Sequence, residues 1–159
     1  MRVKKSNEEV LIATEKIIKL QSAFIDSLKK KASVNVRKRI RLCTHKDTHE
    51  SIHEMFIVHT KGAYIRPHKH LCKIVSLYIL EGSCEIIFFD EKGQIAEIIK
   101  MGDYHSKYVF YLKIEQPIYH TMLVKSPYLV FHEVTNGPFD KADTIFAPWS
   151  PAESDKLAV

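Results

Sequence analysis

The chain has 159 residues, of which 45% are hydrophobic and 27% charged, a composition typical of one globular domain with a buried core. Its three cysteines form no Cys-x-x-Cys pair, its N-terminus has no apolar signal core, and no stretch reaches the roughly 18 apolar residues of a membrane span. We therefore expect a cytoplasmic protein without disulfides or membrane-spanning segments.

Positive charge is concentrated near the N-terminus. Residues 1–46 hold 13 Lys and Arg against 4 Asp and Glu, whereas residues 47–159 hold 11 against 15. A basic segment can attract nucleic acid, a membrane surface or an anionic ligand. Aromatic residues that would stack on bases do not alternate with these cations, so we do not expect nucleic-acid binding.

The first part of the chain is predicted to be helical. Ser6 and Glu9 have the spacing of a capping box, and apolar pairs recur every seven residues between Val10 and Leu28. This pattern predicts one amphipathic helix from Ser6 to about Ser33. Its apolar stripe is longer than one small barrel needs for packing, which predicts a homodimer.

From residue 37 the hydrophobic pattern changes to a period of two. About nine short alternating segments follow, separated by turn signals, and the sequence from Asp90 to Gly93 is typical of a hairpin turn. This favours an antiparallel sandwich or barrel. After residue 134, three prolines exclude a central strand, while Phe and Trp side chains are expected to hold the tail against the barrel.

The chain is therefore divided into three segments. Residues 1–36 are expected to form a basic helix and linker, residues 37–134 a β-barrel, and residues 135–159 a proline- and aromatic-rich tail packed on the barrel. No internal repeat or low-complexity stretch suggests a further division.

Three histidines form a candidate metal site. His68 and His70 are two residues apart in an extended segment, so their side chains are expected on the same face of a strand. His120 lies in a later strand pattern that can face them across a barrel. Neutral imidazoles bind divalent ions of the Fe, Zn, Mn and Ni class, and the pattern does not distinguish among these metals.

The spacing Gly-x5-His-x-His-x11-Gly, followed by a later His, resembles the two motifs of the cupin superfamily. Further similarity, across residues 37–153, is to the WbuC-type cupin-fold metalloproteins and is carried by the sequences YIRPHKH at 64–70, GPF at 137–139 and FAPWSPAE at 146–153. The resemblance implies an all-β, cupin-type double-stranded β-helix (jelly-roll barrel) preceded by an N-terminal amphipathic α-helix. It also implies a sugar or nucleotide-sugar ligand in surface-polysaccharide (O-antigen-like) biosynthesis.

One position departs from the cupin pattern. A glutamate is expected five residues after the second histidine of the pair, and this chain has Val75 there. Three explanations stay open: a three-histidine site without a carboxylate, Cys72 as a soft fourth ligand, or loss of the metal. In the last case the histidines would serve as acid–base or binding groups.

Further residues are candidates for the ligand site. Arg66 can pair with a carboxylate or phosphate through two parallel hydrogen bonds, and Tyr64, His45 and His132 are the other ligand-binding candidates. The catalytic candidates are His68, Tyr64, Tyr119 and Glu133. Because side chains alternate along a strand, only one of His132 and Glu133 is expected to face the cavity.

Three functions remain open at this point. The first is a metal-binding cupin that acts on or binds a small polar ligand, anionic or sugar-like, with the ion as a Lewis acid or as the site that binds dioxygen. The second is a metal-free sugar isomerase or epimerase, in which His68 or His120 removes a proton and Tyr64 or Tyr119 returns one. The third is a non-catalytic ligand-binding or regulatory barrel.

Overall fold

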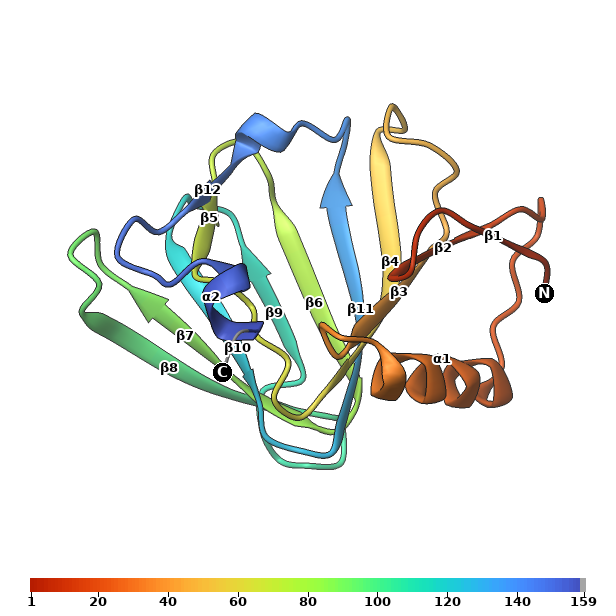
Figure 1. Cartoon of the computed structure of the whole chain (residues 1–159), viewed down its shortest axis with the longest axis horizontal. Coiled ribbons are helices and arrows are strands. Elements are labelled where there is room, and N and C mark those ends of the chain that lie inside the picture. Colours follow the sequence, from red (N-terminus) through yellow and green to blue (C-terminus); the bar gives the residue numbers. More distant parts are fainter. Residues whose placement is uncertain (158–159) are drawn as a thin grey trace.

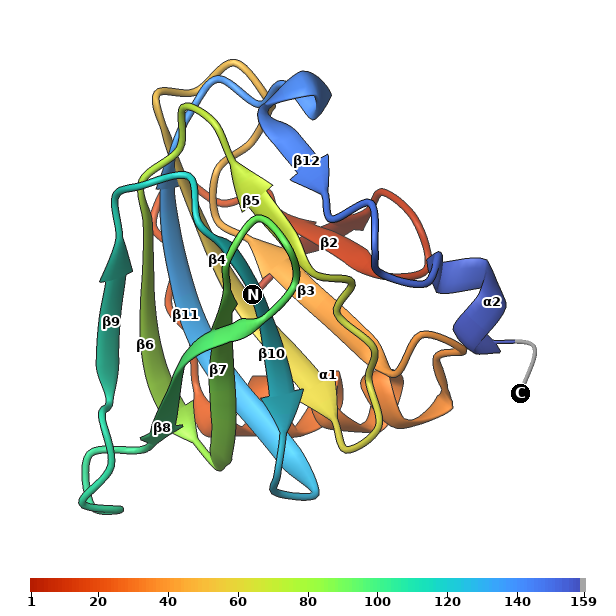
Figure 2. The same ribbon diagram turned by 90° about the vertical axis from the view of Figure 1, so that its left-hand side faces the viewer.

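The computed structural model describes residues 1–157, which form two facing β-sheets and a helix on the outer side of one of them (Figures 1 and 2). The seven-stranded sheet contains, in spatial order, β1 (Val3–Lys5), β2 (Val10–Ala13), β3 (Arg39–Cys43), β4 (Ile52–Thr60), β11 (Tyr128–Asn136), β6 (Val75–Glu81) and β9 (Tyr111–Ile114). The five-stranded sheet contains β12 (Thr144–Phe146), β5 (His68–His70), β10 (Tyr119–Val124), β7 (Ser83–Phe89) and β8 (Ile95–Gly102). The helical elements are α1 (Ser22–Val34), the 3₁₀ helix η1 (Lys141–Asp143) and α2 (Glu153–Leu157).

The path of the chain between the sheets identifies the fold. From β4 to β12 successive strands alternate between the two sheets, apart from the β7–β8 hairpin. The paired strands of residues 1–157 run antiparallel except for β2 and β3. Two antiparallel sheets connected in this way form a double-stranded β-helix. The expected cupin-type all-β fold is therefore confirmed.

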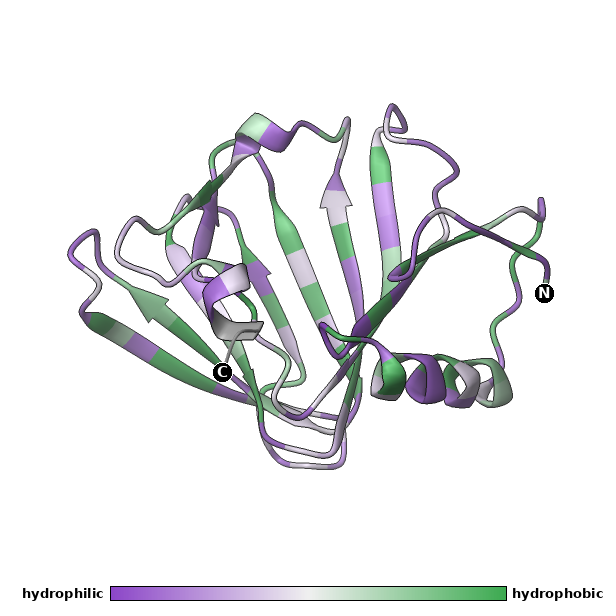
Figure 3. Cartoon of the chain, viewed as in Figure 1, coloured by the Kyte–Doolittle hydropathy of each residue, from purple (hydrophilic) through white to green (hydrophobic). Residues whose placement is uncertain are grey.

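Alternation of side chains builds the barrel core. Along β7, for example, Cys84, Ile86 and Phe88 are buried while the residues between them are partly exposed. Strongly apolar and less apolar residues likewise alternate along the first part of β6 (Figure 3). The predicted hairpin turn at Asp90–Gly93 is present, with the Gly93 N–H donating to the Asp90 carbonyl (3.1 Å) and Gly93 at a φ of 84°.

The predicted helix from Ser6 to about Ser33 is wrong for its first half, because α1 begins only at Ser22 and residues 10–13 form β2, which pairs with β1 just before Ser6. Ser6 and Glu9 belong to the turn between these strands, where the Ser6 N–H donates to the Val10 carbonyl (2.9 Å). Strand β2 lies parallel to β3, and its Leu11 and Ala13 are buried. Hydrogen bonding to β3, a partner distant in sequence, thus overrides the local helical pattern.

Helix α1 covers the outer face of the seven-stranded sheet. Its Leu28 and Ala32 are both 0% exposed and form a cluster with Ile40, Leu42 and Val58 of β3 and β4. The inner face of the same strands is left to line the barrel. No helix in residues 1–157 is long and apolar enough to cross a bilayer.

Both ends of the chain are held against the barrel. Glu9 accepts hydrogen bonds from Arg37 (3.1 Å) and Arg39 (2.9 Å), and Glu153 of the tail is bound by the same two arginines. Trp149 packs against Phe89 at a ring-centroid distance of 4.9 Å. The tail also contributes β12, an edge strand that pairs with β5.

We expect Leu28→Ala to lower the free energy of unfolding by about 2–5 kcal/mol, because it removes a fully buried side chain that joins α1 to the sheet. The matched control is Val34→Ala at the end of the same helix, where the residue is 86% exposed. This control should change stability by no more than about 0.5 kcal/mol. Urea unfolding of the three proteins measures both values, and equal effects would contradict the packing described.

Candidate metal centre and cavity

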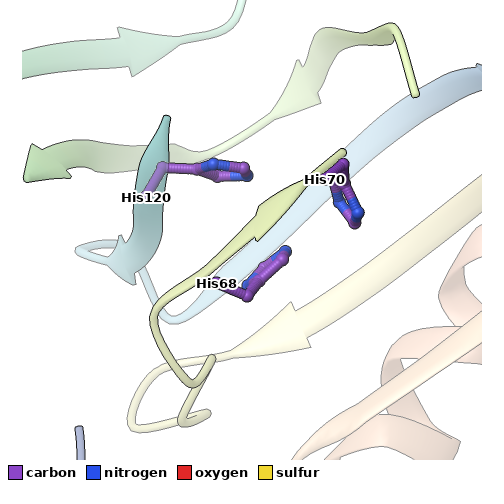
Figure 4. A group of neighbouring side chains, drawn as sticks. All are labelled: His68, His70 and His120. Atoms are coloured by element: carbon purple, nitrogen blue, oxygen red, sulfur yellow. The ribbon is translucent and has the colours of Figure 1, made fainter. Parts of the chain in front are cut away.

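His68, His70 and His120 converge on one point. His68 and His70 lie on β5, and His120 lies on β10 with its Cα paired to that of His68. The three rings point toward one another (Figure 4), and one potential ligand atom of each lies within 4.8 Å of those of the other two. Three imidazoles at this spacing can hold one divalent ion.

Hydrogen bonds to the far side of two rings define their tautomers. The Nδ1 of His68 lies 2.8 Å from the Arg66 carbonyl, and the Nδ1 of His120 lies 2.9 Å from the Ile118 carbonyl. A carbonyl oxygen only accepts, so each Nδ1 carries the proton and each Nε2 keeps a free lone pair. His70 is oriented by Thr144, whose Oγ1 lies 3.3 Å from its Nδ1.

The three histidines are neutral at pH 7. Burial is the main cause that lowers the pKa of His120, to about 4, with the neighbouring His68 adding to it. The pKa of His70 is lowered to about 3 by burial and then by His68 and His120. Burial also lowers the pKa of His68, although its hydrogen bond to the Arg66 carbonyl acts in the opposite direction. Deprotonated imidazoles are the form that binds metal.

The donor set fits a metal ion but contains no carboxylate. Among the described residues, the cluster of close potential ligands consists of the three histidines alone. Val75 of β6, where cupins have glutamate, is 5% exposed and forms part of the cavity wall. Cys72 is exposed and lies outside both the cluster and the cavity, so the structure does not support it as a fourth ligand.

The histidines open into a cavity of about 430 Å³ between the two sheets. The seven-stranded sheet supplies an apolar wall through Met55, Ile57, Leu77 and Phe131. An adjoining cavity of about 700 Å³ also reaches His68 and extends toward the N-terminal turn and Glu153. The volume beside the histidines is sufficient for a small polar molecule.

Neither candidate tyrosine lines these cavities. Tyr64 donates a hydrogen bond from its hydroxyl to the Pro151 carbonyl (3.0 Å) in the tail. Tyr119 is next to His120 on β10 and therefore faces the other way, where it packs on Trp149 and under the Lys69 ammonium. The structure does not bring these tyrosines to the histidines.

The ligand-binding candidates divide between the cavity and its surroundings. His45 lines the cavity, stacked on His53 at a ring-centroid distance of 4.1 Å. Arg66 lines the adjoining cavity, but its guanidinium already donates to the hydroxyl (3.0 Å) and carbonyl (3.3 Å) of Ser150. His132 stacks on Phe56 and lines neither cavity.

Glu133 is the member of the His132–Glu133 pair that faces the cavity, as strand alternation requires. Burial raises the pKa of its carboxyl group, while Arg41 and Lys73 act in the opposite direction. This chain has Val75 on β6 where the cupin pattern has a glutamate. The carboxyl group of Glu133 instead comes from β11, the strand that pairs with β6.

Several cavity residues were not predicted as site residues from the sequence, and they include Arg41, His59 and Lys73. Arg41 could have been found, because it alternates with the buried Ile40 and Leu42 and so lies on the opposite face of β3. Lys73 lies between β5 and β6, where no periodic pattern exists to place it.

Comparison with known proteins identifies a family. A family model described as a domain of unknown function (DUF6016) matches residues 20–101, which is more than half of the chain. The chain belongs to this family. A search of curated proteins gave no match. The DUF6016 match includes His68 and His70 and ends before His120.

Solved structures with related folds include oxalate decarboxylase from Bacillus subtilis (20% identity, TM-score 0.49, 61% of this chain and 24% of that chain). Procruciferin from Brassica napus (12%, 0.46, 60% and 22%) and the Cnp3 cupin domain of Schizosaccharomyces pombe (15%, 0.49, 62% and 64%) are also similar. This DUF6016 chain thus spans about a quarter of the decarboxylase and globulin chains.

The structure predicts a loss of stability in acid. His59 is 7% exposed, and burial, assisted by Arg41, lowers its pKa to about 4. In the unfolded chain His59 binds a proton at about pH 6.5, whereas in the folded chain it does so only at about pH 4. The contribution of His59 to the free energy of unfolding is therefore fully present above about pH 6.5 and is lost as the pH falls toward 4. In chelator-treated protein, His59→Leu should reduce this decline by up to about 1.4 kcal/mol per pH unit.

Urea unfolding between pH 7.5 and 5 measures this dependence. The control is His105→Leu, which removes an exposed histidine and should leave the pH dependence unchanged. An identical pH dependence in wild type and His59→Leu would contradict the neutral, buried state of His59.

Proposed function

We propose that this DUF6016 protein is a metal-binding cupin that binds a small polar ligand beside the His68–His70–His120 centre. The observation that carries the proposal is the convergence of three neutral imidazoles on one point, two of them with Nδ1–H bonded to backbone carbonyls. Such bonds orient metal-binding imidazoles in known sites, and a purely structural cluster has no need of three free ring nitrogens facing one another.

A bound divalent ion would supply Lewis-acid chemistry or a site for dioxygen. The chain contributes the surroundings of that site. Met55, Ile57 and Phe131 form an apolar wall that limits water, and Glu133 places an ionisable carboxyl group in the same cavity. Because burial raises its pKa, this carboxyl group holds a proton at higher pH than an exposed carboxyl group does, which suits an acid–base role in the cavity.

The two alternative functions are affected differently by the structure. A metal-free isomerase that uses Tyr64 or Tyr119 loses its proton donor, since both side chains lie outside the cavity. Another ionisable group of the cavity, such as Glu133, would have to replace them. A non-catalytic ligand-binding barrel uses the same cavity and differs from the proposal only in the absence of turnover.

The ligand we favour is a sugar or nucleotide-sugar of surface-polysaccharide (O-antigen-like) biosynthesis, as the resemblance to the WbuC-type cupins implies. The homodimer also stays a prediction. Part of the apolar stripe that suggested a dimer lies in β2, where Leu11 and Ala13 are buried within the same chain. Light scattering, which measures the molecular mass in solution, distinguishes monomer from dimer.

Metal content tests the proposed centre. Protein purified without a histidine tag should carry about one divalent ion per chain, and His120→Ala should abolish it without unfolding the protein, because two imidazoles bind far more weakly than three. Val75→Glu should raise the occupancy by restoring a charged ligand. His45→Ala, a cavity histidine outside the triad, is the matched control and should retain the ion.

Elemental mass spectrometry measures the ion, and circular dichroism checks the fold of each variant. Stoichiometric metal in His120→Ala would contradict the assignment of ligands. Absence of metal from both the wild type and Val75→Glu would show that the three histidines are not a metal triad.

A further inference from the structure

Charged side chains of the cavity, among them Arg41, Lys73 and Glu133, have no ionic partner at contact distance. Arg41, Lys73 and Glu133 all line it, and within residues 1–157 none of their charged groups forms a hydrogen bond or an ion pair within 4.0 Å. A charged group removed from water is unfavourable unless it is paired, and this applies to Lys73, which is buried, and to the buried carboxyl group of Glu133, whereas Arg41 is exposed to the cavity. The cavity therefore contains groups whose partners are not supplied by the described chain.

Arg41 is directed into the cavity by the alternation of β3. Its neighbours Ile40 and Leu42 are 3% and 0% exposed in the cluster under α1, so Arg41 emerges on the opposite face. It lines both cavities and stands where they adjoin. Its side chain is exposed there, which leaves its five N–H donors available to a ligand.

The other arginines near the cavities are already occupied. Arg37 and Arg39 bind Glu9 and Glu153, and Arg66 binds Ser150. Arg41 thus differs from its neighbours on the same strand and from the arginine that the sequence favoured.

Lys73 is the second cation of the cavity. It is 9% exposed, and its ammonium lies 4.5 Å from the centroid of the Phe139 ring. Its pKa is lowered, first by burial and also by Arg41, although Asp143, Glu133 and Asp140 act in the opposite direction. Arg41 and Lys73 thus bring two like charges to the wall of one cavity, where an anion bound between them would be stabilised by both.

Other polar side chains at the same cavity also lack partners. The Nδ1 of His59, the Nε2 of His53 and the Oγ1 of Thr135 are buried and make no hydrogen bond. Buried polar atoms are normally paired, so orphaned atoms that line one cavity point to a polar ligand. A molecule with hydroxyl or carbonyl oxygens would satisfy them.

We propose that Arg41 and Lys73 form a subsite for an anionic group, a carboxylate or a phosphate, of the ligand that binds beside the three histidines. The proposal rests on the proposed function in so far as both concern the same cavity. Arg41 contributes the planar donors that suit either anion, and Lys73 contributes a point charge in a poorly hydrated position. The unpaired ring nitrogens of His59 and His53 and the unpaired hydroxyl group of Thr135 bind the polar remainder of the ligand, each as donor or acceptor.

The experiment measures anion binding by calorimetry at low ionic strength in metal-free, chelator-treated protein. The probes are inorganic phosphate and malonate, which separate the phosphate from the carboxylate form of the proposal. At least one of them should bind with 1:1 stoichiometry. Arg41→Gln and Lys73→Gln should each weaken that binding about tenfold or more, the loss expected for one charge-assisted hydrogen bond.

Controls separate this subsite from general effects of charge and folding. Lys61→Gln removes an exposed cation outside both cavities and should leave the affinity unchanged. Arg41→Lys keeps the charge and should recover part of the affinity, which a merely unfolded Arg41→Gln could not explain. Thermal unfolding of every variant confirms that the proteins compared are folded.

Three results would overturn the proposal. The first is that neither probe binds. The second is that wild type, Arg41→Gln and Lys73→Gln bind the probes with equal affinity. The third is that Arg66→Gln weakens binding and Arg41→Gln does not. His120→Ala distinguishes this failure from failure of the metal centre. It should lose the metal and keep the anion site, so each proposal can fail while the other stands.

Discussion

The pairing of β5 with β10 is the interaction on which the candidate site depends. Within the described residues it consists of one Cα pair, between His68 and His120, and it joins positions 52 residues apart in sequence. Strand β5 has only three residues, so its place in the sheet also depends on β12 along its other edge. Thr144 of β12 lies opposite His70 and contacts its Nδ1, which makes the C-terminal segment part of the histidine site.

Burial of the seven-stranded sheet on both faces gives the cavity its wall. Ile40, Leu42 and Val58 pack under α1, and the alternate residues Arg41 and Ile57 face the barrel interior. A shift of register by one residue would exchange these two sets and place the arginine against the helix. Packing of α1 on the outside of the barrel therefore helps to define which side chains can meet a ligand inside it.

Two groups of charged residues can be distinguished: those that form ion pairs within the chain and those in the cavity that can bind a ligand. Around Glu9 and Glu153 two arginines and two carboxylates form ion pairs with one another and hold both ends of the chain. In the cavity the three histidines of the candidate metal centre are neutral, and the only carboxyl group in its wall that belongs to a sheet of the described chain is Glu133. A divalent ion bound by neutral ligands keeps its full charge, which adds to the preference for an anionic ligand.

The sequence by itself determined the strand period, the hairpin turn at Gly93 and the parity of His68 and His70, because each depends on residues a few positions apart. Two further predictions needed only the assumption of a two-sheet barrel with alternating side chains. They are that His120 lies near the His68–His70 pair, and that only one of His132 and Glu133 faces the cavity.

Contacts between distant segments decided the rest. Residues 10–13 became a strand because β3 offered a hydrogen-bonding edge, and Tyr64 was drawn to the tail at Pro151. Arg41 and Lys73 share one cavity because β3 and the β5–β6 loop, more than thirty residues apart, meet only after the two sheets close on each other.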